Sequence, residues 1–159
     1  QNWKVRWVAA ELEMKLSDVS QLGEFMAKLG KVRQMSITEP IRYGKLIAEL
    51  PGTPPAREII PPFAAAGQPP AVRLTALGHY LDRGSTNQLA ALDAMAQDPT
   101  RVPECAKDTE GCEWSCEVAS DGQRVIRPVR TIGEFIQWCV KPAILARAAE
   151  ATGAKTASN

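Results

Sequence analysis

Four cysteines, all in the last third of the chain, constrain this sequence more than any other feature. Three of them lie within the twelve residues "CAKDTEGCEWSC", and the fourth is Cys139. An even number of cysteines in one polar, loop-like region indicates two disulfide bonds and an oxidising compartment. Of the three possible pairings we favour Cys105–Cys112, which closes the loop, and Cys116–Cys139, which ties the loop to the following helix.

A four-cysteine zinc site and free buried thiols are the two alternatives to disulfides. Zinc ligands usually come as two close pairs with two to four residues between the ligands. Cys112 and Cys116 have this spacing, but Cys105 and Cys139 form no second pair. We therefore expect no metal and no other cofactor.

The composition is that of a globular protein. The 159 residues are 45% apolar and 23% charged, which suits one ordinary domain or two very small ones. The net charge of +1 gives no reason to expect nucleic acid or an anionic membrane as a partner. No apolar run approaches the roughly 18 residues that a membrane-spanning helix needs.

The chain begins with Gln1 in place of a methionine. This start fits a removed export signal or membrane anchor, and it fits a trimmed sequence equally well. Together with the cysteines, it leads us to expect a periplasmic or otherwise extracytoplasmic protein.

The first third of the chain contains an alternating segment. Residues 8–16, "VAAELEMKL", alternate between apolar and polar side chains, which is the period of a half-buried strand. We predict a strand there, a helix over residues 17–30, and a returning strand over residues 31–38. A single long helix over residues 5–32 fits the apolar spacing loosely, but two internal glycines weaken it.

The middle of the chain is predicted to be helical around a proline-rich connector. A short helix is expected within residues 39–52. Residues 51–70 hold seven prolines and read as a connector whose apolar "IIPPF" packs on its own domain. Two helices, over residues 71–84 and 85–99, are predicted to meet at Gly84.

The last third is predicted to form a β-hairpin followed by helices. Residues 113–129 fit a hairpin whose turn is Asp121-Gly122. Thr131 and Glu134 form a capping box for the next helix, and Pro142 starts the last one. The resulting prediction is an α+β fold in one compact domain. Its parts are a strand-helix-strand unit (1–50), a connector (51–70), a helical and cysteine-containing unit (71–152) and a polar tail (153–159).

One stretch resembles a metal-binding loop. "LGHYLDRGS", residues 77–85, is similar to the Gly-Asp-x-x-Asp-Arg-Gly motif of calcineurin-type phosphoesterases, but His79 stands where that family has its first aspartate. His79 is also the chain's single histidine, so the two-metal site cannot be assembled. We place His79 on a helix surface and predict a non-enzymatic protein, with an unfamiliar active site near His79 and Asp82 as an alternative.

Tryptophans are the predicted contacts with partner proteins. The chain has four, and Trp3, Trp7 and Trp114 are the candidates for partner binding. Trp114 lies between two cysteines, so we expect it to be either an exposed contact or an indole stacked on a disulfide.

Residues 8–39 resemble the periplasmic domain of the PilO-like alignment proteins of type IV pili and their type II secretion relatives. The likeness lies in an alternating strand with Leu12 and Met14, a turn, a helix with Phe25 and Leu29, and a returning strand. It implies a ferredoxin-like, non-enzymatic domain that pairs with a partner protein in a bacterial envelope complex.

From this resemblance we predict a structural or assembly component that interacts through a strand edge of the N-terminal unit and through the cysteine loop. A free-standing periplasmic or secreted binding, adaptor or immunity protein is the alternative.

Overall fold

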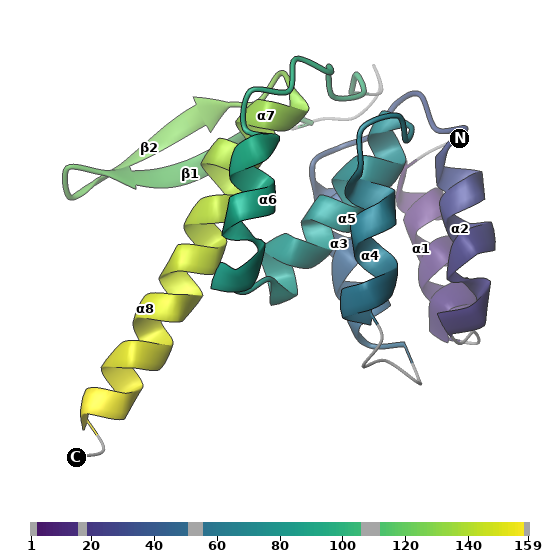
Figure 1. Cartoon of the computed structure of the whole chain (residues 1–159). Helices are drawn as coiled ribbons and strands as arrows, with labels where there is room; N and C mark the ends of the chain where they lie inside the picture. Colours follow the sequence, from purple (N-terminus) through teal and green to yellow (C-terminus); the bar gives the residue numbers. More distant parts are fainter. Residues whose placement is uncertain (1–2, 16–18, 51–55, 106–111, 158–159) are drawn as a thin grey trace.

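In a computed structural model the chain has the predicted α+β class, with many helices and a two-stranded antiparallel sheet (Figure 1). The structure describes residues 3–15, 19–50, 56–105 and 112–157. The helices are α1 (Trp3–Lys15), η1 (Val19–Gln21), α2 (Leu22–Leu29), α3 (Thr38–Ala48), α4 (Ala56–Ala64), α5 (Pro70–Arg83), η2 (Thr86–Gln88), α6 (Leu89–Ala94), α7 (Ile132–Phe135), the π-helical η3 (Ile136–Val140) and α8 (Lys141–Ala157). The strands are β1 (Ser115–Ser120) and β2 (Gln123–Pro128).

Helices α3 and α5 cross backbone to backbone at the centre of the fold. A Cβ atom at Gly44 of α3 would overlap the backbone of Gly78 and His79, and one at Gly78 of α5 would overlap the carbonyl group of Pro40. Only glycine allows so close an approach. Ten consecutive residues of α5, 71–80, are buried as a result, and α5 is the central element of the core.

The predicted N-terminal strand is wrong, because residues 3–15 form helix α1. Ala10 and Met14 are buried and Trp7 packs partly against the core, which is the i, i+3, i+7 spacing of one helical face. Val8 and Leu12, which the strand prediction placed on the buried side with them, are 48% and 58% exposed. Alanine, glutamate, leucine, methionine and lysine, which make up most of this segment, also favour the helix.

The returning strand is also wrong, whereas the helix before it is confirmed at Leu22–Leu29. Within residues 31–38 the only strand-like pairing is an isolated parallel bridge between Gln34 and Glu104. The described part of the N-terminal unit therefore has no strand edge of the kind through which we expected it to bind a partner. Its predicted helix start at residues 17–18 lies outside the described residues.

The proline-rich segment is more ordered than a connector. Residues 56–64 form helix α4, which contains Pro61 and Pro62. Ile60 and Ala64 are buried in the main core, and Phe63 packs against it. The prediction that "IIPPF" packs on its own domain is thus confirmed, because burial of these side chains offsets the two backbone donors that the prolines lack.

The local signals after residue 70 predicted the structure well. The Asp121-Gly122 turn has both residues at positive φ, 51° and 77°, as a two-residue hairpin turn requires. The Glu134 backbone nitrogen donates to the Thr131 hydroxyl at 3.1 Å, and the Thr131 nitrogen donates to the Glu134 carboxylate at 3.2 Å. The predicted polar tail (153–159) starts too early in the sequence, because α8 continues to Ala157.

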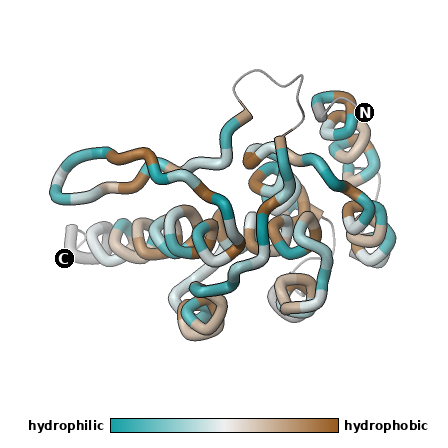
Figure 2. Tube along the Cα trace, turned by 90° about the horizontal axis from the view of Figure 1, so that it is seen from above, coloured by the Kyte–Doolittle hydropathy of each residue, from teal (hydrophilic) through white to brown (hydrophobic). Residues whose placement is uncertain are grey.

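The hairpin and α8 project from the helical body on the side away from α1 and α2 (Figures 1 and 2). The C-terminus lies at the free end of α8, far from the N-terminus. In Figure 2 the hairpin shows apolar residues in its middle and hydrophilic residues at its tip.

The α3–α5 crossing gives a first prediction. Replacing Gly78 by alanine should lower the free energy of unfolding by at least about 2 kcal/mol, because the added methyl group overlaps the backbone of α3. The matched control is Gly23→Ala in α2, where nothing lies within 4 Å of the added atom. That variant should gain up to about 1 kcal/mol from helix propensity. Urea unfolding measures both, and equal stabilities would contradict the crossing.

Candidate functional site

The four cysteines form the two predicted disulfide bonds. Cys105 pairs with Cys112 and Cys116 with Cys139, with Cα atoms 5.8 Å and 5.6 Å apart. All four thiols are used in this way, so the zinc-site and free-thiol alternatives are wrong.

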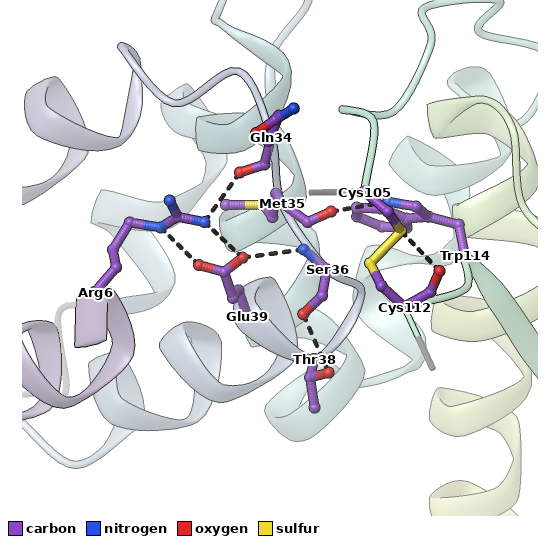
Figure 3. The surroundings of a disulfide bond; sticks show 9 residues. All are labelled: Arg6, Gln34, Met35, Ser36, Thr38, Glu39, Cys105, Cys112 and Trp114. Atoms are coloured by element: carbon purple, nitrogen blue, oxygen red, sulfur yellow. Dashed lines mark hydrogen bonds and ion pairs between the residues drawn. A yellow bond between two sulfur atoms is a disulfide. The ribbon is translucent and has the colours of Figure 1, made fainter. Parts of the chain in front are cut away.

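Glu104 and Trp114, which flank the Cys105–Cys112 disulfide in the sequence, hold the segment before α3 in place (Figure 3). The backbone nitrogen of Met35 donates to the Glu104 carbonyl oxygen at 3.0 Å, and the Trp114 indole nitrogen donates to the Met35 carbonyl oxygen at 3.0 Å. Both backbone groups of this buried methionine are therefore satisfied by residues next to the disulfide. The C-terminal cysteine region thus fixes an N-terminal segment.

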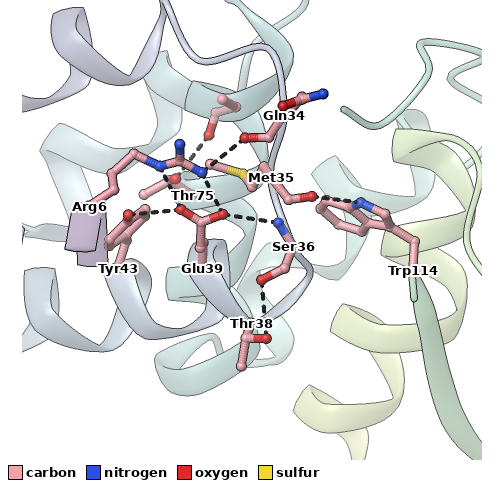
Figure 4. Close-up of polar contacts among 10 residues, drawn as sticks. Arg6, Gln34, Met35, Ser36, Thr38, Glu39, Tyr43, Thr75 and Trp114 are labelled. Atoms are coloured by element: carbon pink, nitrogen blue, oxygen red, sulfur yellow. Dashed lines mark hydrogen bonds and ion pairs between the residues drawn. The ribbon is translucent and has the colours of Figure 1, made fainter. Parts of the chain in front are cut away.

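The adjacent Glu39 is a fully buried carboxylate with four hydrogen-bond donors around it (Figure 4). Arg6 Nε and Nη2 donate to its two oxygens at 2.8 Å each, the Ser36 nitrogen donates at 3.0 Å, and the Tyr43 hydroxyl donates at 3.1 Å. Arg6 Nη2 also donates to the Gln34 carbonyl oxygen at 2.9 Å. A carboxylate that is satisfied in this way holds α1 to α3 and is not free to act as a base.

Arg6 and Tyr43 keep their charge states over the ordinary pH range. Burial lowers the pKa of Arg6, but the hydrogen bonds and the negative charge of Glu39 outweigh burial and hold that pKa above its usual value. Burial, followed by the charge of Glu39, raises the pKa of Tyr43. Arg6 is therefore a cation and Tyr43 a neutral donor.

The predicted tryptophans lie in different places. Trp114 is half-buried and packs edge-to-face on Phe135 with ring centroids 6.1 Å apart. Trp7 is half-buried beneath the Arg42 guanidinium, 4.5 Å from the ring centroid. The Trp3 side chain lies outside the described part of the chain. Partner binding by these three residues stays a prediction.

The β1–β2 hairpin is the most exposed element of the cysteine region. Five of the six residues of β2 are exposed, and Ile126 is 70% exposed. The hairpin is held at its base, where Cys116 is bonded to Cys139 of η3 and Arg127 stacks over Trp138 with 5.2 Å to the ring centroid. Sequence reasoning located the hairpin but gave no signal that it would project.

His79 is not on the helix surface, as we had predicted, but is 93% buried (7% exposed), because α3 crosses α5 at this point. Its Nδ1 lies 3.1 Å from the Gly44 carbonyl oxygen, and burial lowers its pKa. His79 also lines a surface pocket of about 250 Å³ at the end of α5. Asp82 does not line this pocket and pairs with the neighbouring Arg83 at 3.0 Å.

No model of a known protein family matches the sequence, and no curated protein and no solved structure matches it either. Within the described ranges, every helix is too short or too polar to cross a bilayer.

The buried ion pair gives a second prediction. Glu39→Gln should lower the free energy of unfolding by about 3 kcal/mol, because it leaves the Arg6 charge partly buried without its partner. The control is Glu117→Gln, which breaks the exposed Glu117–Arg124 pair on the hairpin and should change stability little. Denaturant unfolding compares the two variants, and equal losses would contradict the structural role of Glu39.

The single histidine gives a third prediction. Because burial lowers the folded-state pKa of His79 below its ordinary 6.5, the unfolded chain binds more protons as the pH falls. The stability contributed by neutral His79 is thus present above that value and is lost as the pH falls below it.

Denaturant unfolding at a series of pH values should show this loss in the wild type. The variant His79→Asn keeps an amide that can donate to Gly44 but does not titrate, so its stability should vary less with pH over the same range. An identical pH dependence in both proteins would contradict the assignment.

Proposed function

We propose that this protein is a non-enzymatic binding module of an oxidising, extracytoplasmic compartment, and that the β1–β2 hairpin is the arm with which it docks on a partner protein. The proposal rests on the exposure of β2, in which the large apolar side chain of Ile126 is 70% exposed. An apolar side chain that stays exposed on a projecting strand offers a contact to an extended partner segment.

The base of the hairpin is rigid, which favours binding. A disulfide joins Cys116 to η3, and the backbone nitrogen of Val129 donates to the Trp114 carbonyl oxygen at 2.7 Å. Val118 and Val129 are buried beside this base. A docking element whose base is already ordered loses less conformational entropy when it binds than a flexible loop does.

The hairpin also offers an open strand edge. Among the described residues, β1 and β2 pair only with each other. Gln123 is the first residue after the two-residue turn and pairs with Ser120. In an antiparallel pair, the backbone N–H groups of successive residues point alternately toward the partner strand and away from it. The N–H groups of Arg124 and Ile126 therefore point away from β1. An extended segment of a partner could therefore add beside β2 as a third strand and cover Ile126.

Charge indicates the chemistry of that segment. Arg124, Arg127 and Arg130 lie on or directly after β2, and residues 123–130 contain no acidic side chain. Glu117 on β1 pairs with Arg124 at 3.2 Å, but both side chains are more than half exposed. The partner segment that fits best is extended and acidic, with an apolar residue to contact Ile126.

The two disulfides support the proposed extracytoplasmic compartment, because such bonds persist outside the reducing cytosol. A role in assembling a bacterial envelope complex of the pilus or secretion type, with membrane-bound partners, stays a prediction. So does the alternative of a free-standing periplasmic or secreted adaptor or immunity protein. Both require a docking surface of the kind proposed here.

A fourth prediction tests the docking arm. A library of short random peptides is panned against the disulfide-bonded protein, and the enriched peptides should be acidic and rich in β-branched residues. Their affinity, measured by fluorescence anisotropy, should fall about tenfold in the variant Ile126→Gln, which loses most of the apolar contact.

The matched control is Leu145→Gln on α8, which removes another apolar side chain that is half exposed. It should leave peptide affinity unchanged. If no peptide is enriched, or if both variants bind equally well, the hairpin is not the docking arm.

A further inference from the structure

A polar pocket at the end of α5 is separate from the hairpin and calls for its own explanation. It has a volume of about 250 Å³ and lies where α5 ends and η2 begins. Its lining residues are His79, Tyr80, Arg83, Gly84, Ser85, Asn87 and Gln88. The size suits a small polar molecule or ion.

His79, which lines this pocket, has a ring nitrogen without a hydrogen-bond partner among the described residues. A carbonyl oxygen only accepts hydrogen bonds, so Nδ1, at 3.1 Å from the Gly44 oxygen, must carry the proton. Nε2 then holds a lone pair, and no described residue donates to it. Although the residue is 93% buried, Nε2 is not among the fully enclosed atoms without a partner. It therefore keeps an opening to solvent, which the pocket provides.

The remaining lining is rich in hydrogen-bond donors. Arg83 brings a cationic guanidinium, Tyr80 a hydroxyl group and Asn87 a side-chain amide, and no aspartate or glutamate lines the pocket. Ser85 is already engaged, because its backbone nitrogen donates to the Gln88 side chain at 2.6 Å. The pocket therefore favours anionic oxygens at most positions and a proton donor at Nε2.

We infer that this pocket is a binding site for a small oxyanion of the phosphate type, which is held between His79 and Arg83 with one proton shared between Nε2 and an anion oxygen. Hydrogen phosphate supplies that proton from its own P–OH group. A carboxylate supplies none, so it binds there only when the imidazole first takes a proton from solution. In either complex the anion oxygens accept hydrogen bonds from Arg83.

The neighbouring charged groups change the electrostatic potential at this site but do not occupy the pocket. Asp82 pairs with Arg83 at 3.0 Å and lowers the positive charge offered to an anion. Arg147 of α8 donates to the carbonyl oxygens of Tyr80, Leu81 and Gly84 and adds positive charge near the helix end. From α3 the contact is the neutral Gly44 carbonyl. Asp82 and Arg83 are thus the charged groups that act directly on His79.

The chain's single histidine makes a direct test possible, because the imidazole nitrogens of the whole protein give one set of NMR signals. The full disulfide-bonded chain, labelled with ¹⁵N, is titrated with sodium phosphate and separately with sodium acetate between about pH 6 and 8 at constant ionic strength. Phosphate should shift the imidazole signals to saturation and raise the pKa of His79.

The acetate titration distinguishes the two sources of an oxyanion. If phosphate alone saturates the site, the ligand is a phosphate group. If acetate also saturates it, more tightly as the pH falls, the site takes carboxylates as well and the proposed oxyanion chemistry holds. If neither anion produces a saturating shift, the proposal is overturned.

Variants separate the site from a general charge effect. Arg83→Gln should weaken phosphate binding about tenfold, and Asp82→Asn should strengthen it, because the guanidinium loses its competing carboxylate. The control, Arg124→Gln, makes the same charge change on the hairpin and should leave binding unchanged. Equal weakening by the two arginine variants would overturn the proposal. His79→Asn has no imidazole, so its titration is followed through the backbone amide ¹⁵N signals; it should abolish the binding while thermal unfolding still shows a folded protein.

Discussion

The backbone contact between α3 and α5 at Gly44 and Gly78 is the constraint on which the rest of the structure depends. It fixes α3 against the most buried helix of the protein. At one end of α3, this position brings Glu39 to meet the arginine of α1. Further along α3, the same contact brings the Gly44 carbonyl to Nδ1 of His79, which decides the tautomer of the imidazole and leaves Nε2 as the acceptor. A core contact without any side chain thus organises two polar clusters.

The features that could be predicted from the sequence are those that depend on neighbouring residues. The Asp121-Gly122 turn needs only two residues that tolerate positive φ, and the Thr131–Glu134 box needs only its own four-residue spacing. The disulfide pairing was also predicted, because Cys105–Cys112, 7 residues apart, closes the loop and Cys116–Cys139, 23 residues apart, ties it to the following helix. The hairpin that carries the proposed function was therefore predictable as an element, although its projection was not.

The features that could not be predicted depend on distant contacts. The alternation in residues 8–16 satisfies a strand as well as a helix, and only the packing of Ala10 and Met14 against the core selects the helix. The burial of His79 depends on a glycine 35 residues away. The Glu39 cluster joins α1 to α3, and Trp114 donates to a carbonyl group 79 residues away. The periodic pattern of a single sequence carries no information about contact partners so far apart in the chain.

The Cys116–Cys139 bond also has a mechanical consequence. Cys139 lies two residues before α8, a helix of 17 residues and about 25 Å in length. Force applied at the far end of α8 first meets the hydrogen bonds of Arg147 to the end of α5 and the buried side chain of Ile144, and then the covalent link at Cys139. A load on the C-terminal helix is therefore shared between the core around α5 and the hairpin, which the disulfide ties to η3.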